Sequence, residues 1–443
     1  MSQLLITFYG DDFTGSTDAL EQLTLAGIRT ALFIEPPTPA QLKHYPGLQA
    51  VGVAGMTRAM TPSGMRKVLP SAFTKLQKLG ARHVHYKVCS TFDSSPEIGN
   101  LGTVVDIASK IFRAPFIPLL AAAPALGRFT IFGTHFARYG IGSQGTVHRL
   151  DRHPSISRHP ITPMTEADLR LHLAKQTEKK IALFDILKIA LPEKQARTEL
   201  NKILVEKPDI VLFDALSIEH LSSIGKLIDG FAMDKRLLFS IGSSGIETAL
   251  ASLWKRKKAK IPRVRPAKQV LIGSGSCSPV TLGQIGWALK HGFAGVPLNA
   301  SALINPQTRS GEVKHATTAA VKFLKDGRSV ILFTCKTAPD KRIGGKFKNQ
   351  TAKILGTALG QALRGALEQS SVRRICIAGG DTSSYAARTL GIEALEMIAP
   401  LTPGAPLCRA SAPGLPADHR ELIFKGGQVG AENYFEIVKR GRI

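Results

Sequence analysis

Short apolar runs alternate with amphipathic helical stretches along most of the chain. Candidate strands, most of them apolar, lie at 4–9, 30–34, 50–53, 83–87, 130–132, 210–213, 237–241, 270–272, 330–333 and 375–378. Helical patterns separate several of them, for example over 63–79 and 165–176. This alternation predicts an α/β protein with mostly parallel sheets that carry helices on both faces.

A basic stretch interrupts the pattern once. Between Lys255 and Lys268 the chain is rich in lysine and arginine and has no acidic residue, and Pro262 and Pro266 break any helix. A chain of 443 residues favours two or three domains. We therefore expect an N-terminal domain over 1–254, an exposed basic linker over 255–268 and a C-terminal domain over 269–443.

The charge balance leaves two kinds of partner open. The 58 Lys and Arg residues outnumber the 33 Asp and Glu residues, which gives a net charge of +25. Such a surface can bind nucleic acid or attract small anionic substrates. No zinc-finger spacing, RNP-type aromatic motif or basic-zipper heptad accompanies the basic stretch, and aromatic residues make up only 6% of the chain. Nucleic-acid binding therefore stays an alternative that depends on the linker alone.

Cysteine usage and hydropathy indicate the compartment. Five cysteines are scattered without CxxC spacing, which is typical of reduced thiols in a cytoplasm and not of a disulfide framework or a zinc site. No stretch approaches the roughly 18 apolar residues that span a bilayer. The first residues also lack the basic flank and apolar core of a secretory signal. We expect a cytoplasmic protein without a membrane segment.

The first strand ends in an unusual turn. An apolar run up to Tyr9 is followed by Gly10, Asp11, Asp12 and a Thr-Gly-Ser turn that opens a helix. Ligands of open α/β sheets bind at this carboxyl edge. Two adjacent carboxylates there are costly unless they meet hydroxyls, a cation or a metal. Capping of the helix explains one of the two acids but not the pair.

Two further segments of the N-terminal domain carry charged residues after a strand. Lys87 precedes a hydroxyl-rich turn that contains Asp93 and Ser94, and Arg58 follows the strand at 50–53. Lysine and arginine can pair with an anionic substrate, while Asp and Ser can bind its hydroxyls. Alternatively, Lys87 pairs with a neighbouring acid and Arg58 is solvated. Together with the two aspartates, these residues suggest a polyol that bears a carboxylate.

The C-terminal domain has three turns rich in small residues. They lie at 273–278, at 379–384 and at 426–430, and the first two open helices. Glycine lets the backbone approach a ligand closely, and a helix N-terminus offers free N–H groups to phosphate. There is no GxxxxGK[ST] run and no GxGxxG dinucleotide fingerprint, which disfavours a Walker-type site and an NAD-dependent oxidoreductase.

At these motifs the chain resembles the four-carbon acid sugar kinase family, over nearly its whole length. The resemblance is carried by 10–15, 87–94, 275–278 with Thr281 and Gln284, 378–382, Pro403 with Gly404, and 425–427. The block Cys89-Ser90-Thr91-Phe92-Asp93-Ser94 is similar to that of members resembling 3-oxo-tetronate kinases. The Asp-Ser-Thr-Leu-Arg-Gly block of threonate- and erythronate-type members is absent.

The resemblance implies phosphoryl transfer from ATP, carried with Mg²⁺, to the terminal hydroxyl of a four-carbon sugar acid in a cleft between the domains. Asp12, or alternatively Asp11, would act as the base. The sugar acid would be bound by Asp11, Asp12, Arg58, Lys87, Asp93 and Ser94. The nucleotide would be bound by Ser276, Gly379, Gly380, Asp381, Thr382, Lys425, Gly426 and Gly427. The sequence assigns no magnesium ligands.

Two questions stay open at this point. A sugar-acid-binding regulator without catalytic activity would keep the same pocket, although the intact glycine turns of the C-terminal domain count against it. The sequence does not determine the oligomeric state, for which a homodimer is the commonest solution.

Overall fold

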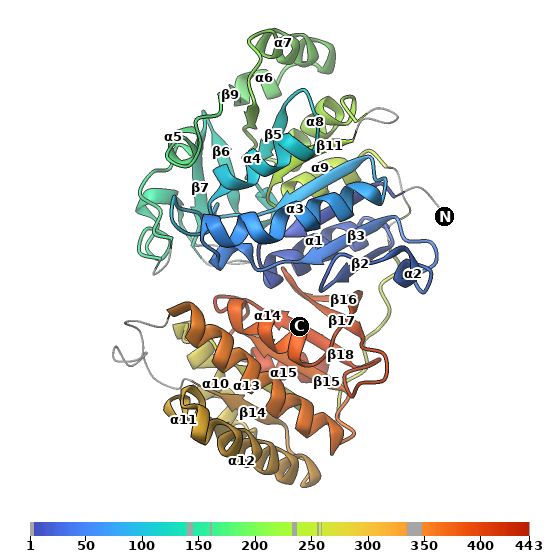
Figure 1. The fold of residues 1–443 in the computed structure, drawn as a ribbon, viewed down its shortest axis with the longest axis vertical. Helices are drawn as coiled ribbons and strands as arrows, with labels where there is room; N and C mark the ends of the chain where they lie inside the picture. Colours follow the sequence, from blue (N-terminus) through green and yellow to red (C-terminus); the bar gives the residue numbers. More distant parts are fainter. Residues whose placement is uncertain are drawn as a thin grey trace. The chain divides into compact units, whose positions relative to one another are not determined.

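The computed structural model describes residues 4–139, 145–159, 162–232, 237–254, 257, 259–334 and 348–442. The chain forms two compact units: unit 1 comprises Met1–Ala31 and Glu35–Ala259, and unit 2 comprises Leu32–Ile34 and Lys260–Ile443. Each unit is built on a sheet with helices packed on it (Figure 1). The predicted two-domain α/β class with mostly parallel strands is therefore confirmed.

The main sheet of unit 1 is parallel throughout. Its strands are β1 (Ile6–Gly10), β3 (Ala50–Ala54), β4 (His83–Lys87), β5 (Ile117–Leu120), β9 (Ile181–Phe184), β10 (Ile210–Phe213) and β11 (Leu238–Gly242). They follow the order β3–β1–β4–β11–β5–β10–β9. Every residue of β1, β3, β4 and β11 is buried, which agrees with the mostly apolar sequences of β1, β3 and β11; β4 buries His83, His85 and Lys87 as well.

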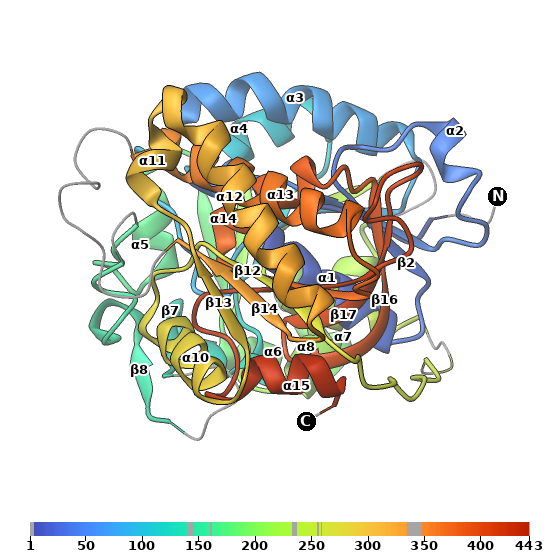
Figure 2. The same ribbon diagram turned by 90° about the horizontal axis from the view of Figure 1, so that it is seen from below.

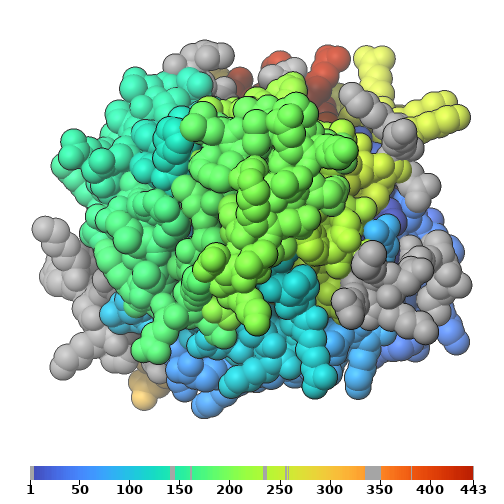
Figure 3. Space-filling view, turned by 90° about the horizontal axis from the view of Figure 1, so that it is seen from above, coloured from blue at the N-terminus to red at the C-terminus, as the bar shows by residue number. Residues whose placement is uncertain are grey.

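Helices cover both faces of this sheet. They are α1 (Phe13–Leu25), α2 (Pro39–Leu42), α3 (Pro62–Lys78), α4 (Leu101–Ile111), α5 (Leu169–Ala174), α6 (Ile186–Ile189), α7 (Glu193–Val205), α8 (Ile218–Asp229) and α9 (Gly245–Ala251). On one face Phe73 of α3 contacts the rings of Tyr9 and Tyr86, at centroid distances of 6.2 and 6.0 Å. Because side chains alternate along a strand, the next residues, Gly10 and Lys87, face α1 and α9 instead. Figure 3 shows the surface of unit 1 on the side of α7, much of which is formed by the segment from α5 to α8 (green).

Two predicted elements of unit 1 differ from the structure. The run at 130–132 belongs to a small antiparallel sheet of β6 (Arg128–Ile131), β7 (Thr134–Arg138) and β8 (Val147–Arg149), not to the parallel sheet. Phe132 and Gly133 form its tight turn, with φ of 49° and 80°. The helix predicted over 165–176 begins only at Leu169, because Asp168 is its N-cap and accepts from the N–H of Arg170.

Unit 2 has a mixed sheet. Its strands are β12 (Val270–Ser274), β13 (Ala294–Pro297), β14 (Val330–Phe333), β15 (Arg374–Ala378), β16 (Ala394–Thr402), β17 (Ala405–Ser411) and β18 (Glu421–Lys425). The order is β13–β14–β12–β15–β18–β17–β16, parallel as far as β18 and antiparallel from there. The sequence pattern predicted the parallel strands β12, β14 and β15 but did not reveal the antiparallel part.

The helices of unit 2 also form two layers. They are α10 (Pro279–Lys290), α11 (Ala300–Ile304), α12 (Pro306–Lys325), α13 (Lys348–Glu368), α14 (Gly380–Thr389) and α15 (Tyr434–Arg440). Figure 2 shows α12 and α13 on one side of the strands and α10 with α15 on the other. Val270 and Ile272 of β12 pack in a core cluster with Ile285 of α10 and Phe435 of α15.

One short segment joins unit 2 although it lies far away in the sequence. Strand β2 (Thr30–Phe33) contributes Leu32 and Phe33, which pair antiparallel with Leu395 and Ala394 of β16. The N–H of the following residue, Ile34, donates to the carbonyl of Glu393 at 3.0 Å. The apolar pattern does not indicate this pairing with β16, because the run at 30–34 looks like any other buried strand.

The predicted linker is described only in part. Lys255, Arg256 and Lys258 lie outside the described residues, whereas 259–268 form no helix or strand and are mostly exposed. Cys335 is likewise outside the description, whereas Cys376 and Cys408 are buried and Cys277 is exposed. Within the described ranges, none of the helices has both the length and the apolar character needed to cross a lipid bilayer.

Candidate functional site

The predicted sugar-acid residues of unit 1 follow neighbouring strands. Gly10, Lys87 and Gly242 stand side by side at the ends of β1, β4 and β11, and Ala54 of β3 is aligned with Gly10. The turns that leave these strands therefore share one edge of the sheet. The backbone N–H of Asp11 donates to the carbonyl of Lys87 at 2.8 Å, and the N–H of Arg58 donates to the carbonyl of Asp11 at 2.9 Å.

Asp12 is fully engaged within this edge. It is the N-cap of α1, where Oδ1 accepts from the N–H of Gly15 at 2.7 Å and Oδ2 accepts from the hydroxyl of Thr14 at 2.7 Å. The guanidinium of Arg58 lies 2.7 Å from Oδ2. Burial alone would raise the pKa of Asp12, but Arg58 and these hydrogen bonds hold it below its ordinary value. Asp12 is thus a fixed negative charge and confirms the capping interpretation for one acid of the pair.

Asp11 has the opposite environment. Its side chain is buried, and among the described residues none donates a hydrogen bond to Oδ1. Burial and the neighbouring charge of Asp12 raise the pKa of Asp11 to about 7, against the opposing effects of Arg58 and Lys87. Two adjacent carboxylates are therefore separated by their surroundings into one that is permanently charged and one that can exchange a proton near neutral pH.

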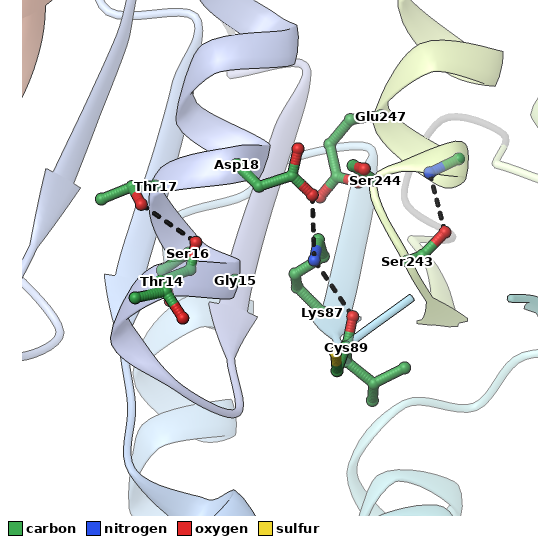
Figure 4. A network of polar contacts seen from close by, with 12 residues as sticks. Thr14, Gly15, Ser16, Thr17, Asp18, Lys87, Cys89, Ser243, Ser244 and Glu247 are labelled. Atoms are coloured by element: carbon green, nitrogen blue, oxygen red, sulfur yellow. Dashed lines mark hydrogen bonds and ion pairs between the residues drawn. The ribbon is translucent and has the colours of Figure 1, made fainter. Parts of the chain in front are cut away.

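Lys87 lies inside unit 1 and not at its surface. The side chain is 1% exposed, and its Nζ lies 3.3 Å from Oδ2 of Asp18 and donates to the carbonyl of Val88 at 3.0 Å (Figure 4). Glu247 at the start of α9 faces the same ammonium (Figure 4). The pairing with a neighbouring acid, which sequence reasoning left open, is the arrangement found.

Sequence reasoning missed both of these acids. Glu247 follows the turn Ser243-Ser244-Gly245 at the end of β11, a strand–turn–helix pattern like the one that drew attention to Asp11. This pattern could have identified Glu247. Asp18 carries no such signal, because an acid in the second turn of a helix is ordinarily solvated.

The turn after Lys87 is held by its own side chains. The hydroxyl of Thr91 donates to Asp93 at 2.7 Å, and Asp93 contributes to the electrostatic environment of Arg58. Ser94 is 2% exposed and its hydroxyl contacts Nε2 of His172 at 2.9 Å and the amide of Gln176 at 3.0 Å. Asp93 is therefore near the charged edge, whereas Ser94 is hydrogen-bonded to His172 of α5 and to Gln176, which follows this helix.

In unit 2 the predicted nucleotide residues also meet. Ser274, Ala378 and Lys425 are aligned at the ends of the neighbouring strands β12, β15 and β18. The N–H of Gly379 donates to the carbonyl of Lys425 at 2.9 Å. The turns that follow pack so closely that a Cβ on Gly275 would lie 2.2 Å from Oγ1 of Thr382, and one on Gly427 would lie 2.8 Å from Oγ of Ser276.

Two helices begin at this edge without a side-chain cap. Helix α10 follows the N-cap Ser278 and α14 follows the N-cap Gly379, and neither N-cap residue makes a capping hydrogen bond from its side chain. The first-turn N–H groups of both helices thus lack the partner that a capping side chain supplies, as an anion-binding site requires. Gly380 and Asp381 belong to the first turn of α14; the side chain of Asp381 lies outside the described part.

Lys425 is buried in unit 2 behind these turns. Its exposed fraction is 0%, and its Nζ donates to the hydroxyl of Thr281 at 2.9 Å, which in turn donates to the carbonyl of Gly427 at 2.8 Å. Burial lowers the pKa of Lys425 to about 8. The amide of Gln284 donates to the carbonyls of Val429 and two following residues. These side chains hold the 426–431 loop from behind.

The arrangement of side chains offers no protein-only metal site in the part of the chain that the structure describes. Within it, no three His, Cys, Asp or Glu residues gather in a geometry that could hold a metal ion. The residues that converge are instead suited to a charged polyol in unit 1 and to an anion in unit 2.

Comparison with known proteins agrees with this division. A family model described as a sugar-binding N-terminal domain matches residues 6–250, and one described as a nucleotide-binding C-terminal domain matches residues 271–435. The chain is 38% identical to the 3-oxo-isoapionate kinase of Paraburkholderia graminis, over 99% of this chain and 95% of that protein. It is 30% identical to the 3-oxo-tetronate kinase of Pseudomonas savastanoi pv. phaseolicola, over 97% of this chain and 96% of that protein.

Solved structures share the fold. A protein from Salmonella typhimurium LT2 matches with a TM-score of 0.77 and 24% identity, over 100% of both chains. Haemophilus influenzae protein HI1011 matches with a TM-score of 0.69 and 21% identity, over 98% of both chains. With the two family models and the kinase relatives, these findings show that the chain belongs to the four-carbon acid sugar kinase family, a family of sugar-acid phosphotransferases.

Proposed function

We propose that this protein transfers the γ-phosphoryl group of ATP to the terminal hydroxyl of a small 3-oxo sugar acid. The observation that carries the proposal is the pair Asp11 and Asp12, in which one carboxylate is held charged by Arg58 and the other has a free buried oxygen and a pKa of about 7. A general base works best when its pKa lies near the operating pH. Asp11 therefore fits the base better than Asp12, which is already saturated with hydrogen bonds.

The proposed chemical step assigns a part to each residue of this edge. The substrate hydroxyl gives its proton to Asp11 as its oxygen bonds to the γ-phosphorus, and the bond from that phosphorus to the bridging oxygen breaks to release ADP. Asp12 orients Arg58, whose guanidinium pairs with the substrate carboxylate. Asp93 accepts a hydrogen bond from an intervening hydroxyl. Lys87 acts from behind, through Asp11, and Ser94 supports the turn.

In unit 2 we assign the phosphates of ATP to the open N-termini of α10 and α14. The backbone of Gly379, Gly380, Asp381 and Thr382 and the hydroxyl of Ser276 would hold them, with Gly426 and Gly427 closing the turn. We assign Lys425, which the sequence predicted to bind the nucleotide, the part of supporting that turn through Thr281. Mg²⁺ bound to ATP supplies charge neutralisation on the phosphates. The cleft between the domains, which transfer requires, stays a prediction.

The names of the relatives support the proposed substrate class. Those named above are kinases of 3-oxo-isoapionate and 3-oxo-tetronate, and the second name matches the branch that the block from Cys89 to Ser94 resembles. The greater identity to the 3-oxo-isoapionate kinase makes that acid the first to test. Threonate and erythronate are the control acids, because they lack the 3-oxo group.

An ADP-release assay with purified protein tests the proposal. We expect release that depends on ATP, Mg²⁺ and a 3-oxo acid, and a fall in kcat of about 10²–10⁴ for Asp11→Asn. Asp106→Asn, an exposed carboxylate of α4, is the matched control and should keep wild-type rates. If none of the acids named above stimulates the release of ADP, the proposal is refuted. A salt-sensitive shift of random DNA without such release would favour the nucleic-acid alternative instead.

A further inference from the structure

The carboxylates of Asp11, Asp18 and Glu247 are buried together with the ammonium of Lys87. Lys87 ends β4, the strand between β1 and β11. Asp18 of α1 and Glu247 of α9 approach its ammonium on the helix-covered face (Figure 4). The proposed reaction uses Asp11 but assigns nothing to Asp18 or Glu247.

The two acids are bound differently. Asp18 lies 3.3 Å from the ammonium through Oδ2. Glu247 is 0% exposed, and within the described part of the chain neither carboxyl oxygen has a hydrogen-bond partner. Its Oε1 lies 3.6 Å from Nε2 of His85. A carboxylate with no partner at zero exposure is costly when ionised, so Glu247 is better accommodated as a neutral acid.

Lys87 also reaches the catalytic turn. A Cβ built on Gly15 would lie 3.5 Å from Nζ of Lys87 and 3.8 Å from Oδ1 of Asp11, so both atoms border the same small space. Lys87 and Asp11 each favour the charged form of the other. The oxygen of Asp11 that lacks a hydrogen-bond donor among the described residues, Oδ1, is thus the one that borders this space.

The roles of the buried acids differ according to whether each acid has a cation to pair with. Arg58 is matched by Asp12 and Lys87 by Asp18. Asp11 and Glu247 remain without a matching cation, and burial raises the pKa of Glu247 to about 8. His85 adds no positive charge, because burial lowers its pKa to about 3. Near pH 7 Glu247 carries its proton, and Asp11 is the group that titrates.

We propose that Asp18 is a positioning residue that, by neutralising Lys87, keeps Asp11 able to accept a proton, while Glu247 fills the other side of the ammonium as a neutral acid. This inference rests on the proposed function in that it takes Asp11 as the base. The groups that face Lys87 are Asp11, Asp18, Glu247 and His85, and the thiol of Cys89 lies beside them.

The pH dependence of kcat separates this arrangement from a merely structural one. In Asp18→Asn the ammonium of Lys87 has lost its paired carboxylate and favours the charged form of Asp11 more strongly, so the acid limb of the kcat profile should move to lower pH by about one unit. In Glu247→Gln a neutral group replaces a neutral group, so the acid limb should stay where it is. Coincident profiles for Asp18→Asn and wild type, or an equal shift in Glu247→Gln, would overturn the proposal.

Folding and activity are controlled separately. If Asp18→Asn does not fold because Lys87 is left unpaired, the double variant Asp18→Asn with Lys87→Met removes both charges. Its acid limb should stay close to that of wild type, because an ammonium and the carboxylate that neutralises it are removed together, and a limb shifted to lower pH as far as that of Asp18→Asn would count against the proposal.

A second readout does not need turnover. In protein labelled with ¹³C at the aspartate carboxyl, the Asp11 signal, assigned by its loss in Asp11→Asn, should titrate with the same shifts. If wild type shows no kinase activity, the proposed function fails, and these titrations still decide the role of Asp18.

Discussion

The pH dependence of unfolding provides a quantitative test of the buried acid Glu247. Its ordinary pKa is 4.5, and burial raises the pKa to about 8 in the folded protein. The folded state therefore binds a proton that the unfolded state has released between these values, and stability falls as pH rises through that window. The full window of about 3.5 units corresponds to roughly 5 kcal/mol at about 1.4 kcal/mol per unit.

Replacing the acid by its neutral isostere removes this penalty. We expect Glu247→Gln to match wild type near pH 4.5 and to be more stable at pH 7 by roughly 3 kcal/mol, since about 2.5 units of the window lie below that pH. Replacement of an exposed acid has no such effect, so Glu178→Gln is the matched control.

Urea unfolding at several pH values measures the effect on unit 1 alone. The protein has two tryptophans, Trp254 in unit 1 and Trp287 in unit 2. In a Trp287→Phe background, the fluorescence of Trp254 follows the unfolding of unit 1. The free energy of unfolding is then plotted against pH for wild type and for Glu247→Gln. Two plots that run parallel from pH 5 to pH 9 would refute the assignment of a buried neutral acid.

Three further substitutions test unit 2. Lys425→Met should raise KM for ATP several-fold without changing KM for the sugar acid, because the ammonium holds the glycine loop from behind; a change in both would contradict this role. Gly427→Ala places a Cβ about 2.8 Å from a serine hydroxyl and should also weaken ATP binding, measured by calorimetry, where unchanged affinity would exclude this turn from the site. Arg374→Met removes the 2.7 Å ion pair with Glu421 and the hydrogen bonds that the guanidinium donates to three carbonyls, so we expect unit 2 to lose roughly 3 kcal/mol in hydrogen-exchange measurements; a loss below 1 kcal/mol would show that the buried pair contributes little.

The parallel strands and the acidic turn could be predicted because their signals are local. A strand that is buried on both faces is usually an apolar run wherever it lies in the fold, as the agreement at 210–213 and 330–333 illustrates. The pair Asp11 and Asp12 stands directly after such a run. Neither feature depends on which strand becomes the neighbour.

Features that depend on distant partners could not be predicted. The burial of Asp18 requires α9 to pack on α1, and the addition of Leu32–Ile34 to unit 2 requires β16 as its partner. The antiparallel β16 and β17 are interrupted by Pro400 and Pro406 and contain charged residues, so their pattern does not distinguish them from loops.

The two lysines selected from the sequence show how strand register decides which residue can reach a ligand. Lys87 still pairs in the ladder with Gly10 and Gly242, and Lys425 pairs with Ala378. A side chain inside the ladder points to a face of the sheet, and in an α/β fold that face is covered by helices. Both lysines are accordingly buried and support a turn from behind. Asp11 follows the last ladder residue of β1 and begins the turn, although its N–H still donates to the carbonyl of Lys87. The residues that contact substrate should therefore be sought in the turns beyond the final ladder pair of each strand, where Asp11, Arg58 and Asp93 lie.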